Sequence, residues 1–162
     1  MLDRFFTKSR RPHLLFICTA NLCRSPMAEA ICRSMLGSRA WEISSAGFFA
    51  DHPLPPVPEV LALLKLRGLD SDHLSSKRVE KPLIRRATGI FAMTELHLTT
   101  LRRQFPKAAE NAHLVTAFST IPAYQNQDVP DPIGCDQHAF EETFRILEDA
   151  MPQIIDFLDG RL

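Results

Sequence analysis

The most constraining feature of the sequence is the stretch from His13 to Glu29, which reads HLLFICTANLCRSPMAE. Its apolar run, Leu14 to Ile17, is typical of a strand that is buried on both faces of a parallel sheet. Ser25 and Pro26 are residue types that helices prefer at the N-cap and at the first helical position. The stretch therefore predicts a buried strand, a short loop and a helix.

The loop between this strand and this helix starts at Cys18 and ends at Arg24, with five residues between them. A loop that enters a helix presents several backbone N–H groups and the positive end of the helix dipole to one point. Arg24 adds a planar fork of donors for phosphate oxygens, and the same positive field favours the thiolate of Cys18. We therefore predict a phosphate socket with a sulfur nucleophile. The alternative interpretation is a small buried cysteine and a surface arginine.

The rest of the chain alternates between strand and helix patterns. Further strands are predicted at 41–45, 89–93 and 113–118, and helices at 26–36, 58–67, 80–87, after Thr94 and at 136–158. In the first helix, Ala28, Ile31 and Met35 are expected to face the sheet. Alternating elements predict parallel crossovers, hence an α/β fold with an open four-stranded parallel sheet and helices on both faces. Ligands in such folds bind beyond the carboxyl ends of the strands, which is where the Cys18 loop would lie.

The length and composition fit one ordinary globular domain. The chain has 162 residues, of which 45% are hydrophobic and 23% are charged. Residues 1–12 are expected to be a flexible extension that precedes a domain at 13–162. The 19 basic and 19 acidic residues cancel, so no global field favours nucleic acid or a membrane as a partner.

Targeting and cysteine patterns predict a cytoplasmic protein. No apolar run reaches the length of about 18 residues that a transmembrane helix needs, and residues 1–12 lack the apolar centre of a secretory signal. The four cysteines, at 18, 23, 32 and 135, form no C-x-x-C pair and no zinc spacing with the six histidines. We expect reduced thiols and no metal site.

The sequence CTANLCRSPMAE resembles the active-site signature of the low-molecular-weight protein tyrosine phosphatases, C-x-G-N-x-C-R-S-P. A second match, VPDPIG at 129–134, is similar to the D-P motif that carries the general acid of that family. Smaller matches are SSAG at 44–47 and His73, and all of them follow the order of the family. The resemblance implies the same four-stranded parallel fold and phosphate ester hydrolysis on phosphorylated proteins.

The resemblance also implies a role for each matching residue. Cys18 would attack phosphorus and Asp131 would protonate the leaving group, although an Asp-Pro pair alone is an ordinary loop initiator. The loop that holds the phosphate oxygens would comprise Thr19, Ala20, Asn21, Leu22, Cys23 and Arg24. Its shape would be maintained by hydrogen bonds of Asn21, Ser25, Ser45 and His73, with Ser25 also donating to the Cys18 sulfur. Because the socket supplies the positive charge, no metal or other cofactor is expected.

The sequence departs from the family pattern at two positions. Ala20 replaces the usual glycine, which would cost roughly 1 kcal/mol or more if the backbone there needs a positive φ. Ile133 stands where the family often has an aromatic residue, so one wall of the substrate site would be aliphatic. Phe48 or Phe49 is expected to form the other wall.

Several alternatives remain open at this point. Family members that act on phosphoarginine have threonine at the position of the apolar Leu22, so arginine phosphatase activity is the second interpretation. Arsenate reduction would need two further cysteines after the third strand, and residues 91–112 contain none. A non-catalytic phosphate-binding module would not need both Cys18 and Asp131. By the resemblance, Cys23 would form a reversible disulfide with Cys18 under peroxide.

Overall fold

The computed structural model describes residues 11–161, so residues 1–10 of the predicted extension lie outside the described part. The strands are β1 (His13–Cys18), β2 (Glu42–Gly47), β3 (Gly89–Ala92) and β4 (Ala112–Leu114). The helices are α1 (Arg24–Leu36), α2 (Pro58–Leu66), α3 (Lys81–Arg86), α4 (Glu95–Gln104) and α5 (Gln137–Asp159). Two short 3-10 helices, η1 (Pro106–Asn111) and η2 (Val115–Phe118), flank β4.

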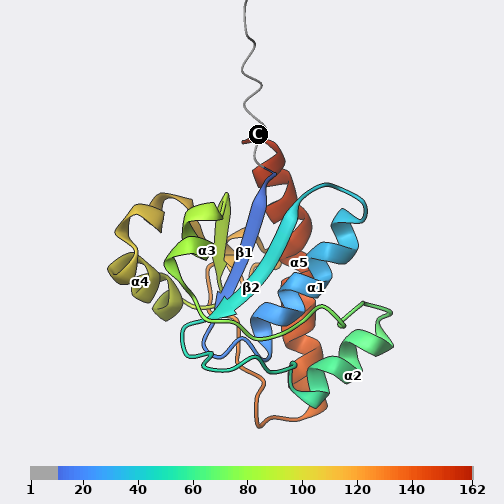
Figure 1. Ribbon diagram of the computed structural model, residues 1–162. Helices are drawn as coiled ribbons and strands as arrows, with labels where there is room; N and C mark the ends of the chain where they lie inside the picture. The colour runs from blue at the N-terminus through green and yellow to red at the C-terminus, as the bar shows by residue number, and fades with distance from the viewer. Residues whose placement is uncertain (1–10, 162) are drawn as a thin grey trace, which may run out of the picture.

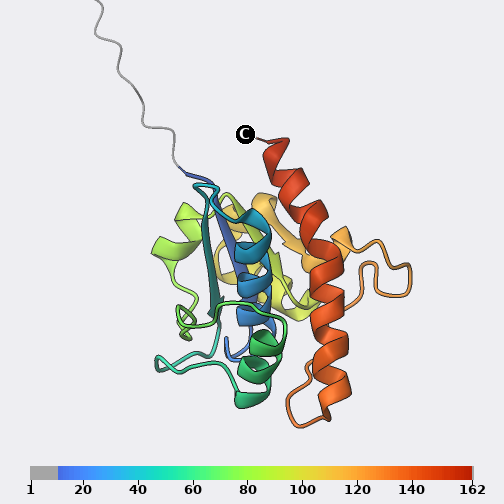
Figure 2. The same cartoon turned by 90° about the vertical axis from the view of Figure 1, so that its right-hand side faces the viewer.

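The four strands form one parallel sheet in the order β2-β1-β3-β4. Figures 1 and 2 show α1 and α5 on one side of this sheet and α3 on the other. The predicted α/β fold with helices on both faces is confirmed. Because β2 and β3 lie on opposite sides of β1, the chain changes direction at β1, and the loop after β1 emerges at that switch point.

Each face of the sheet has its own hydrophobic core. Leu14 and Phe16 of β1 pack with α1, α2 and α5, whereas Leu15 and Ile17 pack with α3 and α4. The alternation follows from the two-residue period of a strand, and full burial of both sets explains the continuous apolar run. The sheet is thereby held on both sides, which gives the loop after β1 a rigid base.

Two predicted boundaries were wrong. The strand predicted at 113–118 ends at Leu114, because Val115 and Thr116 are buried in η2 and the chain turns there. Helix α1 begins at Arg24 with Cys23 as its N-cap residue, so Ser25 and Pro26 lie inside its first turn. Ser25 is therefore not a cap, and its hydroxyl is free to bond elsewhere.

Met35 was also wrongly predicted to face the sheet, since it is 43% exposed. The buried stripe of α1 instead follows the i, i+4 spacing of Ala28, Cys32 and Leu36. Other predictions for the helices are confirmed: Thr94 caps α4 by accepting a hydrogen bond from the His97 amide at 3.1 Å, and α2 begins at Pro58. Within residues 11–161 no helix is both long enough and apolar enough to cross a membrane.

Candidate active site

The loop of residues 18–24 joins the carboxyl end of β1 to the start of α1, at the end of the sheet to which the arrows of Figure 1 point. Cys18 and Arg24 are nearly buried, with exposed fractions of 3% and 6%. Since α1 starts at Arg24, its first backbone amides and the positive end of its dipole face the loop. The loop thus has the local geometry of an anion site.

The Cys18 sulfur lies among hydrogen-bond donors. The Ser25 hydroxyl oxygen is 2.9 Å from Sγ, and the backbone N–H of Asn21 donates to Sγ at 3.3 Å. Both groups can therefore donate a hydrogen bond to a sulfur anion. Ser25 can make this contact because it lies in the first turn of α1 and points back toward the loop.

Asn21 is the residue that gives the loop its shape. It has a positive φ of 57°, a conformation that asparagine tolerates better than most residues. Its side-chain amide donates to the hydroxyls of Ser25 and Ser45 at 2.8 and 2.9 Å, and its Oδ1 accepts from the Lys77 amide at 2.9 Å. Ala20 has no positive φ, so the glycine-to-alanine departure causes no backbone strain at that position.

The hydrogen-bond network continues beneath the loop through Glu29, which sequence reasoning missed. Ser45 donates to Glu29 Oε2 at 2.6 Å, and His73 Nε2 lies 3.7 Å from Glu29 Oε1. Glu29 is only 3% exposed and also pairs with Arg33 at 3.0 Å. His73 therefore reaches the loop through a buried carboxylate. The available sequence signal was spacing, because Glu29 lies four residues after Ser25 on the same face of α1.

The loop that carries Asp131 lies beside the Cys18 loop. It is anchored to the end of β3, where the Val129 amide donates to the Met93 carbonyl at 2.8 Å. Arg24 then contacts it twice, because Nη1 donates to the Val129 carbonyl at 3.0 Å and Nη2 lies 3.3 Å from Asp131 Oδ2. The Asp131 side chain is 48% exposed, whereas the guanidinium is buried. The two motifs, more than a hundred residues apart in sequence, meet at Arg24.

Asp128, the neighbouring carboxylate, has a different position. Its Oδ1 accepts a hydrogen bond from the Glu95 amide at 2.8 Å, so it binds the N-terminus of α4. Asp131 Oδ1 instead accepts from the Ile133 amide at 3.2 Å, within its own turn. Only Asp131 of these two carboxylates contacts Arg24.

The predicted substrate walls are only partly at the surface. Phe49 is 72% exposed and Ile133 is 49% exposed. Phe48 was wrongly proposed as a wall, because it is only 7% exposed and its ring stacks on the imidazole of His97, with centroids 6.1 Å apart. The alternation of β2 continues to these residues, so one of the two adjacent phenylalanines faces the core and the other faces solvent.

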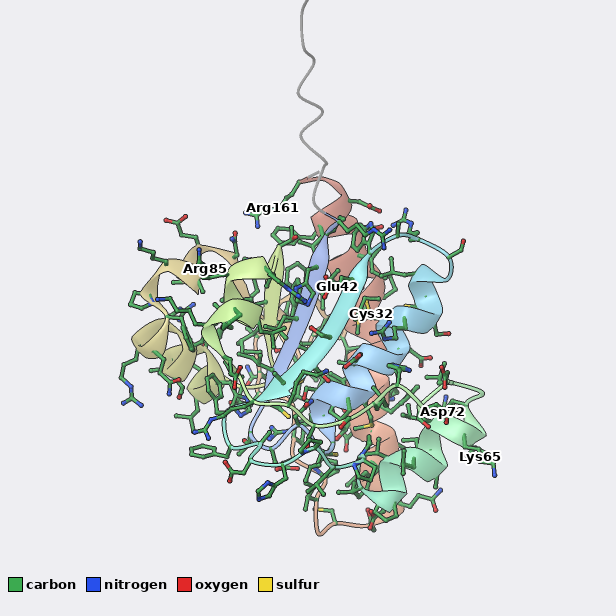
Figure 3. All side chains as sticks on the ribbon, in the orientation of Figure 1. Cys32, Glu42, Lys65, Asp72, Arg85 and Arg161 are labelled. Atoms are coloured by element: carbon green, nitrogen blue, oxygen red, sulfur yellow. The ribbon has the colours of Figure 1, made fainter. Side chains whose placement is uncertain are left out.

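The other three cysteines are two buried thiols with raised pKa values and one exposed thiol. Burial and the negative charge of Asp131 raise the pKa of the Cys23 thiol, and burial raises the pKa of Cys32 to about 12. Figure 3 labels Cys32 on α1, where it is fully buried in the core. Cys135 is exposed. Among residues 11–161, no three His, Cys, Asp or Glu side chains gather as metal ligands would.

Sequence reasoning also missed His97 in the first turns of α4. This side chain is 5% exposed, and its Nε2 lies 2.9 Å from the hydroxyl oxygen of Thr19, the residue that follows Cys18. A histidine in a helix, 78 residues away from the loop, gave no signal of this contact.

Gly47, at the end of β2, yields a testable prediction because the loop rests directly on it. A Cβ at this position would lie 2.7 Å from both the Asn21 nitrogen and the Thr19 oxygen, which are backbone atoms. We expect Gly47→Ala to lower the free energy of unfolding by about 1–3 kcal/mol, as overpacking does, and to weaken phosphate binding. Chemical denaturation and calorimetric titration with phosphate measure both effects.

Gly160→Ala is the matched control, since its Cβ would meet no atom closer than 3.6 Å. Unfolding and phosphate binding in this variant should resemble the wild type. Equal behaviour of the two variants would contradict the packing of the loop on Gly47.

Comparison with known proteins agrees with this geometry. A sequence model of the family described as low molecular weight phosphotyrosine protein phosphatase matches residues 13–161. Low molecular weight protein-tyrosine phosphatase A of Mycobacterium tuberculosis is 31% identical over 155 residues, covering 93% of each chain. A protein-arginine-phosphatase of Geobacillus stearothermophilus is 32% identical over 149 residues, covering 92% of this chain and 95% of the relative.

A solved structure is similar throughout the fold. The protein tyrosine phosphatase of Entamoeba histolytica superposes with a TM-score of 0.83 at 28% identity, covering 93% of this chain and 99% of that one. The match of the family along nearly the whole domain agrees with a cysteine loop after the first strand. This chain belongs to the low molecular weight protein tyrosine phosphatase family of cysteine-dependent phosphate ester hydrolases.

Proposed function

We propose that this protein removes phosphate from phosphotyrosine in protein substrates, with Cys18 as nucleophile, Arg24 as phosphate ligand and Asp131 as general acid and base. The observation that carries this proposal is the position of Arg24. Its buried guanidinium belongs to the nucleophile loop and lies 3.3 Å from Asp131. One cation thus brings together the nucleophile and the acid that phosphate ester hydrolysis needs.

In the first step the Cys18 thiolate attacks phosphorus while the bond from phosphorus to the tyrosine oxygen breaks. Asp131, in its protonated form, gives its proton to the departing phenolic oxygen. The loop amides and Arg24 hold the three equatorial oxygens of the phosphoryl group as charge redistributes. The products of this step are a cysteinyl phosphate and the substrate protein with its tyrosine dephosphorylated.

In the second step water attacks phosphorus and the sulfur leaves as a thiolate. Asp131, now a carboxylate, takes the proton from this water. Inorganic phosphate is released and Cys18 returns to its starting state. The Ser25 hydroxyl and the Asn21 amide, at 2.9 and 3.3 Å from the sulfur, stabilise the leaving thiolate.

Arg24 has a second role in this mechanism, because a guanidinium has more than one edge for donation. A phosphate dianion in the loop competes with Asp131 for the guanidinium and repels the carboxylate. Asp131 is half exposed and can turn toward the leaving oxygen. The buried contact of Arg24 with the Val129 carbonyl keeps the acid loop in place meanwhile.

The surroundings of the loop support tyrosine over arginine. Phe49 and Ile133 expose apolar surface near the two catalytic loops, and Leu22 adds a third apolar side chain within the loop itself. Apolar surface packs against a phenol ring, whereas a phosphorylated guanidine would need polar partners. Since a relative of this chain is named a protein-arginine-phosphatase, phosphoarginine hydrolysis is the second candidate.

We place this activity in the cytoplasm, on phosphorylated proteins. A mechanism that uses a free thiolate needs a compartment in which thiols stay reduced. Balanced charges, with 19 basic and 19 acidic residues, support a protein substrate rather than a nucleic acid or a membrane surface.

The chemical mechanism is tested with aryl phosphates of graded leaving-group acidity. Cys18→Ser should abolish turnover while phosphate still binds, which separates an enzyme from a binding module. Asp131→Ala should slow esters of weakly acidic phenols by about 10²–10⁴-fold and esters of acidic phenols much less. Steady-state kinetics of both variants provide the measurement.

Asp128→Asn is the matched control for the acid. Because Asp128 binds the amide of Glu95, we expect no added dependence on the leaving group in this variant. If Asp128→Asn acquired that dependence and Asp131→Ala did not, the assignment of the acid would be wrong.

Substrate preference is tested with a panel of phosphotyrosine and phosphoarginine peptides. We expect kcat/KM to favour phosphotyrosine, and serine substitutions at Phe49 and Ile133 to reduce that preference by removing apolar contacts. Leu66→Ser is the control, since Leu66 on α2 is as exposed as Phe49, at 72%. Preference for phosphoarginine in the wild type would make arginine phosphatase activity the correct function.

We further propose that Cys23 protects Cys18 from irreversible oxidation. Peroxide converts the Cys18 thiolate to a sulfenic acid, which condenses with the Cys23 thiol to a disulfide and water. Activity lost to peroxide should therefore return with dithiothreitol in the wild type and in Cys32→Ser, but not in Cys23→Ser. Irreversible loss in the wild type would argue against this protection.

A further inference from the structure

Helix α4 contacts both catalytic loops through its first turns. The amide of Glu95 donates to Asp128, in the loop that carries the general acid, at 2.8 Å. Two residues later, His97 Nε2 lies 2.9 Å from the Thr19 hydroxyl oxygen, in the loop that carries the nucleophile. The Thr94 hydroxyl stabilises this turn by accepting a hydrogen bond from the backbone amide of His97. The start of α4 therefore contacts both loops of the proposed active site.

His97 is held in place on its other sides. Its exposed fraction is 5%, and its ring stacks on Phe48 with an interplanar angle of 24°. Phe48 in turn donates its amide to the Cys18 carbonyl at 3.2 Å, and Phe49 donates to the Thr19 carbonyl at 2.8 Å. The Thr19 backbone is thus held by the segment that follows β2, and the Thr19 side chain is held by α4.

The protonation of His97 is determined by its surroundings. Burial, followed by the positive charge of Arg24, lowers the pKa of His97 to about 4, so the ring is neutral near pH 7. Nδ1 is buried and has no hydrogen-bond partner among the residues that the structure describes. An unpaired buried N–H is rarer and costlier than an unpaired acceptor, so the proton belongs on Nε2, which donates to Thr19.

From these contacts we infer that His97 is a positioning residue of the phosphate-binding loop, acting through its hydrogen bond to Thr19. This inference rests on the proposed function, because it assigns a role in the same site. By fixing the residue that follows the nucleophile, His97 keeps the loop amides aimed at one point before phosphate arrives. Preorganisation of this kind lowers the ordering cost of binding.

The test compares substitutions that keep or remove this one hydrogen bond. His97→Phe keeps a ring against Phe48 but has no donor, while His97→Gln places an amide nitrogen near the position of Nε2. Thr19→Val removes the hydroxyl at constant shape. We expect His97→Phe and Thr19→Val each to weaken phosphate binding and lower kcat/KM by roughly three- to tenfold, the worth of one hydrogen bond.

A double variant distinguishes an effect that acts through the hydrogen bond between His97 and Thr19 from a general loss of packing. The double variant His97→Phe/Thr19→Val should be little worse than either single variant, because both remove the same interaction. His97→Gln should recover most of the phosphate affinity. The measurements are calorimetric titration with inorganic phosphate and steady-state turnover of p-nitrophenyl phosphate, on the full chain.

His13→Phe is the matched control at the opposite end of β1. His13 is 1% exposed, its Nε2 lies 2.6 Å from the Ser44 hydroxyl oxygen, and its Nδ1 also lacks a partner among the described residues. His13 is therefore, like His97, a buried histidine whose Nε2 contacts a hydroxyl group, but it lies away from the phosphate-binding loop. Its loss should lower the free energy of unfolding without changing the phosphate affinity of the folded protein.

The inference is overturned if His97→Phe binds phosphate as tightly as the wild type, or if the losses of the two single variants multiply in the double variant. It is also overturned if His13→Phe weakens phosphate binding as much as His97→Phe does. Failure of the proposed function would look different, since the wild type itself would then neither bind phosphate nor hydrolyse p-nitrophenyl phosphate.

Discussion

The contacts of the buried Arg24 guanidinium with the loop that carries Asp131 hold the site together. An arginine that is 6% exposed needs partners for its charge and its donors, and the structure supplies the Val129 carbonyl and the Asp131 carboxylate. These partners come from a loop that follows the last strand, whereas Arg24 is the first residue of α1. The electrostatic requirement of one side chain thus holds together two distant parts of the chain.

This requirement can be met because of the parallel sheet. Strand β1 is buried on both faces, so the loop after it starts from a fixed point. Met93, the residue that follows β3, provides the carbonyl that anchors the loop carrying Asp131. Buried polar groups then stiffen the loop itself, through Asn21, Ser45 and Glu29. Packing places the backbone, and the hydrogen bonds select one conformation of the loop.

Local sequence signals were sufficient for the parts of this arrangement that depend on neighbours in the chain. The apolar run before Cys18, the alternation of elements and the glycine and proline positions predicted the sheet and most helices. Signals failed where a residue is determined by distant contacts: Met35 lies just outside the buried stripe of α1, and β4 gives way to a turn that buries Val115. Periodicity alone does not distinguish these cases.

The residues of the site likewise fall into those that local sequence predicts and those that depend on distant contacts. The spacing of Cys18 and Arg24 and the Asp-Pro pair at Asp131 are readable in the sequence, because they follow motifs. Glu29 and His97 are not, since each contacts a residue from another element, and Phe48 stacks on the ring of His97. A buried polar residue beneath a loop has no local signature until its partner is known.

In the proposed mechanism the Cys18 sulfur attacks phosphorus within the phosphate-binding loop. The most direct measurement is rapid acid quenching of the enzyme during turnover of an aryl phosphate, followed by mass spectrometry of its peptides. We predict one phosphoryl group, attached to Cys18 and absent in Cys18→Ser. Steady turnover with a phosphoryl group on another residue, or release of phosphate by a direct attack of water, would contradict it.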